Sequence, residues 1–162
     1  MINQTCKQCA DESNIFSYKF CSTSLEAIPV SHVTNLQGLA LIAMELALNN
    51  TTNTISIIKE LLSDKTLVDP LALEGLKDCL ELYSDAVSTI LDSIAAFLGE
   101  QYGVADVWLS AVMEAATTCE EGLKEKQVDK ALSPLKNENY SLFQLCDIAL
   151  CISHLLNQVV HS

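Results

Sequence analysis

Two long segments with helical periodicity, joined by a very short link, constrain this 162-residue chain more than any other feature. Apolar residues recur every three or four positions through 71–98 and again through 102–123, as in helices that bury one stripe. The link around Gly99 and Gly103 makes the two helices antiparallel. Cys79 then lies near the start of one helix and Cys119 near the end of the other, at similar depths. A disulfide between them would clamp the pair.

Two further segments have the same periodicity. Ser31 is the expected cap of a helix over 32–63, and the last helix is expected over 138–160. The weak helix formers in 49–54 predict a bend, a loosened turn or a break in the first of these. Four amphipathic helices joined by short loops predict an all-α fold, an up-down-up-down four-helix bundle over residues 30–162.

The N-terminal residues 1–29 predict a small helical hairpin in front of the bundle. Short helices are expected over 5–12 and 18–27, and Pro29 ends the module. Cys6 and Cys21 are 15 positions apart, which suits a disulfide that closes a hairpin too small to hold itself. Such a bridge stabilises by roughly 3 kcal/mol in the chain-entropy model. The whole chain, 1–162, is then expected to form one domain.

The charge balance limits the kind of partner. The chain has nine Lys and no Arg, and its net charge is −12, so nucleic acid and anionic membrane surfaces are unlikely partners. A basic protein surface fits better. The longest apolar run, 39–44, is far shorter than the roughly 20 residues of a membrane span, so we expect no transmembrane helix. The polar start of the chain predicts a mature form whose leader has been removed.

No constellation of residues predicts catalysis, a cofactor or a metal. Cys6 and Cys9 form a single C-x2-C without a second pair, and His154 follows Cys151 where a di-metal bundle would need a carboxylate. No nucleophile–base pair is visible, so we expect a binding protein rather than an enzyme. One helix flank is acidic, either as a solvated face or as a footprint for a basic partner; its residues are Glu74, Asp78, Glu81, Asp85 and Asp92.

Two features are compatible with secretion. Seven cysteines suggest two disulfides and spare buried thiols, with Cys9, Cys146 and Cys151 left unassigned. Four N-x-S/T triplets are candidate N-glycosylation sites, although such triplets often arise by chance; they begin at Asn3, Asn49, Asn50 and Asn139.

Several stretches together resemble the plant invertase and pectin methylesterase inhibitor family, including its pollen allergens. The similarity covers nearly the whole chain, and the matching stretches surround the four cysteines paired above, Cys6, Cys21, Cys79 and Cys119. They are Cys6 with Tyr18-Lys19-Phe20-Cys21, Asn35-Leu36-Gln37-Gly38-Leu39-Ala40, the run 78–87 around Cys79, Trp108-Leu109-Ser110-Ala111, Thr118-Cys119-Glu120-Glu121-Gly122 and Leu145-Cys146-Asp147-Ile148-Ala149-Leu150.

The resemblance implies an N-terminal hairpin on a four-helix bundle, with disulfides Cys6–Cys21 and Cys79–Cys119. It also implies secretion to the cell wall, or a vacuolar location if the target is a vacuolar invertase, and one-to-one docking onto that enzyme. Invertase inhibitors of the family carry Pro-Lys-Phe at the connection before the third bundle helix. Residues 100–104 here read Glu-Gln-Tyr-Gly-Val instead, which favours pectin methylesterase. Cys146 matches a free thiol that methylesterase inhibitors can carry.

The sequence therefore predicts an inhibitor that covers the substrate cleft of a cell-wall pectin methylesterase. Invertase inhibition is the alternative, and a storage or allergen bundle, or one that carries an apolar ligand, is a further alternative. The residues expected to contact the partner lie on the acidic flank and at the connection; they are Glu74, Asp78, Glu81, Asp85, Glu100, Gln101 and Tyr102.

Overall fold

The structure is a computed structural model that describes residues 1–64, 70–126 and 133–160. Its elements are helices and one 3-10 turn, and the helical fold class predicted from periodicity is confirmed. In chain order they are α1 (Ile2–Glu12), α2 (Tyr18–Glu26), η1 (Pro29–His32), α3 (Leu36–Ser63), α4 (Pro70–Leu98), α5 (Tyr102–Lys126) and α6 (Lys136–Val160).

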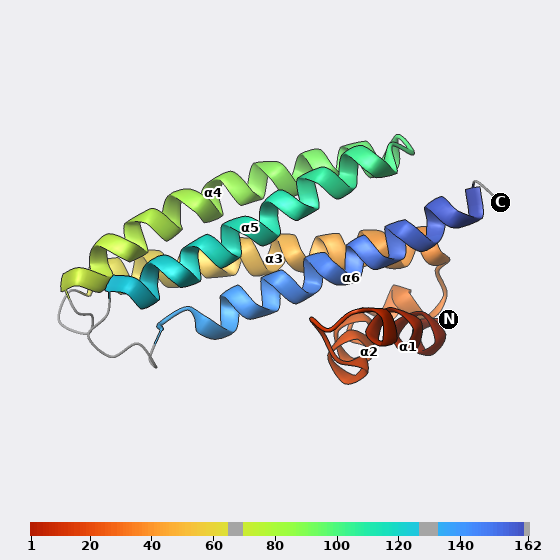
Figure 1. Cartoon of the computed structure of the whole chain (residues 1–162), viewed down its shortest axis with the longest axis horizontal. Helices are drawn as coiled ribbons and strands as arrows, with labels where there is room; N and C mark the ends of the chain where they lie inside the picture. The colour runs from red at the N-terminus through yellow and green to blue at the C-terminus, as the bar shows by residue number, and fades with distance from the viewer. Residues whose placement is uncertain (65–69, 127–132, 161–162) are drawn as a thin grey trace.

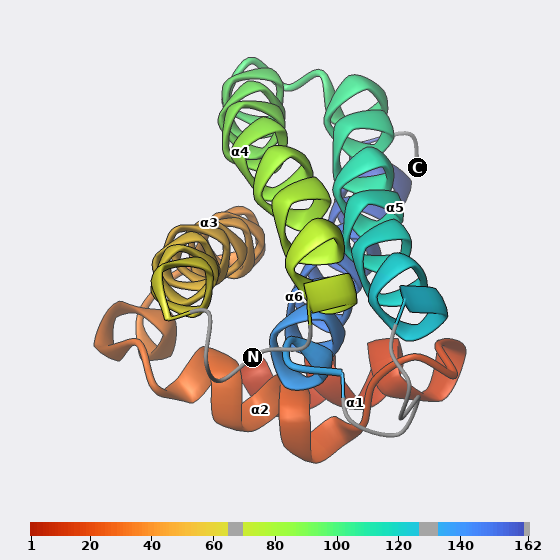
Figure 2. The ribbon, with the colours of Figure 1, turned by 90° about the vertical axis from the view of Figure 1, so that its left-hand side faces the viewer.

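The four long helices form the bundle, and the short pair α1–α2 lies against one side of it (Figure 1). Each bundle helix packs mainly against two others, in the cyclic order α3, α4, α5, α6 and back to α3. Seen from the end, α4 and α5 stand side by side above α3 and α6, with the hairpin beneath (Figure 2). One side of the α4–α5 pair is therefore left without a helix over it.

The core is built from the stripes that the periodicity predicts. In α4 the fully buried side chains include Leu76, Tyr83 and Ile90, and in α5 they include Leu109 and Leu123. These positions are separated by whole helical turns, so each helix turns one apolar side inward. Burying side chains of this size stabilises the fold by roughly 1.5–3 kcal/mol each, before conformational entropy is subtracted.

Helix α3 differs from its prediction at its start and in its middle. The residues 29–32 form the 3-10 turn η1, and the side chain of Asn35, not that of Ser31, caps α3 by accepting from Gly38 N at 2.8 Å. The helix then runs unbroken from 36 to 63, so the expected break at 49–54 is wrong. Thr51 and Thr54 are buried there, and tertiary packing outweighs their weak helix propensity.

Three disulfides join six of the seven cysteines, which is one bridge more than the sequence predicts. Cys6–Cys21 closes the hairpin and Cys79–Cys119 links α4 to α5. The third, Cys9–Cys151, connects α1 to α6 across 142 positions and pairs two cysteines that the sequence left unassigned. Among the described residues only Cys146 remains free, and it is buried, which raises the pKa of its thiol.

The α4–α5 connection is a tight helix end of Schellman type. Gln101 N donates to Ala96 O at 2.9 Å, and Glu100 N donates to Phe97 O at 3.0 Å. Glu100 has a φ of 62°, the left-handed conformation in which glycine is usually found. Gly99 is one position too early to relieve this strain.

The composition of helix α6 can be compared with the expectation of no transmembrane helix. Residues Lys136–Val159 are long and apolar enough for a span by length and composition alone, a criterion that does not decide the expectation, which stays a prediction. In the structure α6 packs on α3 and α5, and its buried residues include Leu142, Ile148 and Ile152. A core helix of a bundle has the same composition, so α6 gives no support for a membrane partner.

Candidate protein-binding surface

The outward side of α4 carries a continuous acidic stripe. Every member is exposed; the residues are Glu74, Asp78, Glu81, Asp85 and Asp92. Successive members are three, four or seven positions apart, which keeps them on one side of the helix. The structure therefore brings the four predicted acidic contact residues together on one surface and adds Asp92 to them.

Helix α5 presents an apolar stripe that the sequence analysis did not identify as a contact surface. Val104, Val107 and Trp108 are 46, 64 and 39% exposed, and Ala111 is also exposed. Their spacing of three and four positions is that of a second helical stripe, separate from the core stripe. This second periodicity is the sequence pattern from which the exposed apolar stripe could have been predicted.

The acidic and apolar stripes lie on the same side of the α4–α5 pair. Cys79 is bonded to Cys119, and Ser93 Oγ donates to Ala105 O at 2.9 Å, so these residues mark where the helices meet. On α4, Asp78 directly precedes Cys79 and Asp92 directly precedes Ser93. On α5, Thr118 directly precedes Cys119 and Val104 directly precedes Ala105. Because α4 and α5 are antiparallel, the side chains one residue before each of these contact residues point toward the same side of the helix pair.

We call this surface the α4–α5 outer face. It comprises Glu74, Asp78, Glu81, Asp85 and Asp92 of α4 with Val104, Val107, Trp108, Ala111 and Thr118 of α5. It is the side of the pair that no other helix covers, which Figure 2 shows from the end. An apolar patch beside charged residues is typical of a protein-binding site.

The connection contributes two of its three predicted contact residues. Glu100 and Gln101 are exposed at the end of the outer face. Tyr102 is only 6% exposed, so its prediction as a contact residue is wrong. Its ring packs on Phe97 with centroids 5.0 Å apart, and its hydroxyl accepts from Gln37 Nε2 at 2.7 Å. Tyr102 closes the core at this end of the bundle.

The candidate glycosylation sites differ in exposure. Asn3 and Asn49 are exposed, while Asn50 is partly buried and its Nδ2 donates to Glu138 O at 3.4 Å. Asn139 is 3% exposed, and its side chain accepts from Tyr83 and donates to Glu120. A glycan on Asn139 is incompatible with this fold because the amide is part of the core, so that prediction is wrong.

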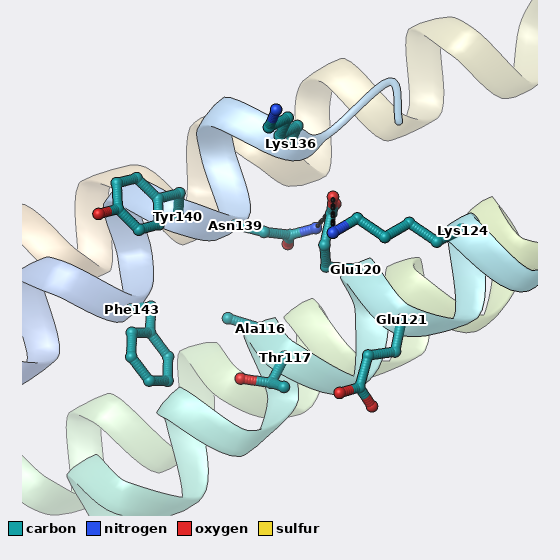
Figure 3. A pocket seen from close by; sticks show the side chains of 9 residues that line it. All are labelled: Ala116, Thr117, Glu120, Glu121, Lys124, Lys136, Asn139, Tyr140 and Phe143. Atoms are coloured by element: carbon teal, nitrogen blue, oxygen red, sulfur yellow. Dashed lines mark hydrogen bonds and ion pairs between the residues drawn. The ribbon is translucent and has the colours of Figure 1, made fainter. Parts of the chain in front are cut away.

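An open groove of about 320 Å³ lies between α5 and α6 on another side of the bundle (Figure 3). Phe143 and Tyr140 line one end, and Lys136 and Lys124 lie toward the other. Glu120 stands between them, where its Oε1 accepts from Ser133 at 2.6 Å and from Asn139 at 3.0 Å. The carboxylate is thus engaged in structural contacts.

His154 has a partner in the structure. Its Nε2 lies 3.2 Å from Asp106 Oδ2, which joins the end of α6 to the start of α5. Burial raises the pKa of Asp106, and the neighbouring Ser153 and His154 offset part of that rise. Within the described ranges, no group of three or more His, Cys, Asp or Glu side chains is arranged to hold a metal ion.

A disulfide-clamped helical bundle that offers one mixed acidic and apolar face defines a class of small binding proteins. Comparison with known families is more specific: the model described as plant invertase/pectin methylesterase inhibitor matches residues 1–152. The chain belongs to this family, as the resemblance of its sequence indicated.

Individual relatives agree with this assignment. A protein from Platanus acerifolia named "Putative invertase inhibitor" is 39% identical over 156 residues, which cover 96% of this chain and 85% of that protein. Pectinesterase inhibitor 12 from Arabidopsis thaliana is 32% identical over 123 residues, 76% of this chain and 68% of that protein.

A solved structure supports the fold. A mutant form of a pectin methylesterase inhibitor from Arabidopsis superposes with a TM-score of 0.76 at 22% identity, covering 94% of this chain and 97% of that one.

Proposed function

We propose that this protein inhibits a plant cell-wall carbohydrate enzyme by laying the α4–α5 outer face over the enzyme's substrate cleft, and that pectin methylesterase is the target. The observation that carries the proposal is the outer face itself. It combines five carboxylates with exposed apolar side chains on a pair of helices that a disulfide holds together. A rigid surface loses little conformational entropy on binding, which favours affinity.

The two stripes would act differently in the complex. Trp108 and its apolar neighbours would supply the desolvated centre, where aromatic residues contribute most of the binding energy. The carboxylates would meet basic groups of the enzyme, speed association and make binding weaker as salt rises. Inhibition of this kind requires no catalytic residues in the inhibitor.

Two observations point to different targets. The connection lacks Pro-Lys-Phe, which the family resemblance associates with invertase inhibition, and this favours pectin methylesterase. The Platanus relative at 39% identity carries an invertase-inhibitor name, which favours invertase as the second candidate. Secretion to the cell wall belongs to the proposal in either case, and a vacuolar invertase would require a vacuolar location.

The test measures pectin demethylation and sucrose hydrolysis in parallel with increasing amounts of the purified protein. The outer-face variant Glu81→Lys/Asp85→Lys should weaken inhibition by about tenfold, equal to about 1.4 kcal/mol, and Trp108→Ala by at least about thirtyfold. The matched control Glu45→Lys/Glu60→Lys changes exposed residues of α3 by the same net charge and should leave inhibition unchanged. Full activity of both enzymes at micromolar excess of the inhibitor would overturn the proposal.

A further inference from the structure

The hairpin is attached to the bundle by a disulfide whose position sets it apart from the other two. Cys6–Cys21 lies within the hairpin and Cys79–Cys119 within the bundle, whereas Cys9–Cys151 crosses from one to the other. Its two cysteines are 142 positions apart. Breaking it would leave each part with its own internal bridge.

Side-chain hydrogen bonds join the loop between α1 and α2 to α6. Ser13 Oγ donates to Asp147 Oδ2 at 2.7 Å, and Tyr140 OH donates to Ile15 O at 3.2 Å. Tyr140 is 58% exposed, so water can replace its bond at little cost. Ile2, Phe16 and Leu25 supply a buried apolar contact. These side chains belong to the same apolar cluster as the core of the bundle, and the disulfide adds a covalent link to that packing.

The bridge is also the one with a partly exposed cysteine. Cys6, Cys9, Cys21, Cys79 and Cys119 are at most 1% exposed, whereas Cys151 is partly exposed. A hollow of about 380 Å³ lies nearby, between α1, α6 and the start of α3, and neither cysteine lines it. Its lining includes Gln8, next to Cys9, and Leu155, one turn from Cys151. Exposed disulfides exchange with thiols faster than buried ones.

We propose that Cys9–Cys151 is a redox-controlled tether: a low-molecular-weight thiol reduces it at the partly exposed Cys151 and releases the hairpin from α6, while the bundle stays folded. The thiolate attacks the sulfur of Cys151, the S–S bond breaks, and Cys9 leaves as a thiolate that takes up a proton. A second thiol then attacks the mixed disulfide on Cys151. Two thiols are oxidised to one small disulfide, and the protein bridge is reduced to two cysteines.

The remaining free cysteine does not interfere with this exchange. Cys146 is fully buried and lies five positions before Cys151, which turns it about 140° away around the helix. Its burial also raises the pKa of its thiol and keeps it protonated and unreactive. Reoxidation should therefore restore Cys9–Cys151 rather than a new pair.

The experiment exposes the intact protein to a graded series of reduced glutathione. Free thiols are alkylated and mapped by mass spectrometry, and backbone deuterium uptake is followed in parallel. We expect Cys9 and Cys151 to become alkylated at an about tenfold lower glutathione concentration than the other four bridged cysteines. Residues 2–26 should gain deuterium at that point while α4 and α5 do not, and oxidised glutathione should reverse the change.

Two variants complete the test. Cys9→Ser/Cys151→Ser should show high deuterium uptake in the hairpin at every thiol concentration, and Cys146→Ser should respond like the unmodified protein. The proposal is overturned if another bridge is reduced first, or if Cys9–Cys151 is reduced and the hairpin's uptake does not change. Because the unmodified protein alone decides both points, a variant that failed to fold would not rescue the proposal.

Discussion

Replacing Tyr83 by Phe tests whether a buried hydrogen-bond network holds α4 to α6. The Tyr83 side chain is fully buried, and its hydroxyl donates to Asn139 Oδ1 at 2.6 Å. Asn139 Nδ2 in turn donates to Glu120 Oε1 at 3.0 Å. Three helices thus share one chain of hydrogen bonds inside the bundle, and burial raises the pKa of Tyr83 well above its usual value.

The expected loss in the free energy of unfolding depends on which buried group loses its hydrogen-bond partner. Phe keeps the ring and its packing but leaves Oδ1 of the buried Asn139 without its donor. An unsatisfied buried acceptor costs about 1–3 kcal/mol, and we expect about 2 kcal/mol for Tyr83→Phe. The matched control is Tyr140→Phe, which removes a hydroxyl from an exposed side chain and should cost less than about 0.5 kcal/mol.

The assay is equilibrium unfolding in urea at neutral pH with the disulfides intact, and the free energies are extrapolated to water. Tyr83→Phe and Tyr140→Phe are compared with the unmodified protein under the same conditions. A loss below about 0.5 kcal/mol for Tyr83→Phe, or an equal loss for both variants, would refute the network as a source of stability.

Three further substitutions test local features. Glu100→Gly should stabilise by about 0.5–1 kcal/mol, seen as a melting temperature about 2 °C higher, because glycine adopts a φ of 62° without strain; an unchanged or lower value would contradict this. Gly38→Ala should cost at least about 1 kcal/mol in urea unfolding, because the new methyl would lie 1.8 Å from Thr34 Oγ1. Asp106→Asn should stabilise at neutral pH and lose this advantage in acid. The folded pKa of Asp106 is raised, so its ionised form costs stability above that pKa and not below it; a pH-independent difference would contradict the cause.

The proposed binding surface follows from how the bundle is assembled. Helix α4 turns its apolar stripe inward and therefore turns its carboxylates outward, while α5 has apolar residues on both sides. The antiparallel pairing, held by Cys79–Cys119, sets the two outward stripes next to each other.

Tertiary contacts also explain why the predictions for Asn139 and Tyr102 are wrong. Asn139 has the N-x-S triplet of a glycosylation site, but the network with Tyr83 and Glu120 places it in the core. Tyr102 follows a turn and was expected at a binding surface, but Phe97 and Gln37 hold it inside. In both cases the local sequence is compatible with exposure, and burial depends on residues far away in the chain.

The sequence by itself determined the helices, their antiparallel order and the bridges Cys6–Cys21 and Cys79–Cys119. Helical periodicity is a local property, and the short connections leave each helix little choice of neighbour. Only the tertiary structure decided the partner of Cys9, the burial of Asn139 and the alignment of the two outward stripes. These depend on the rotation of each helix about its axis and on where the hairpin docks, which packing of the whole core determines.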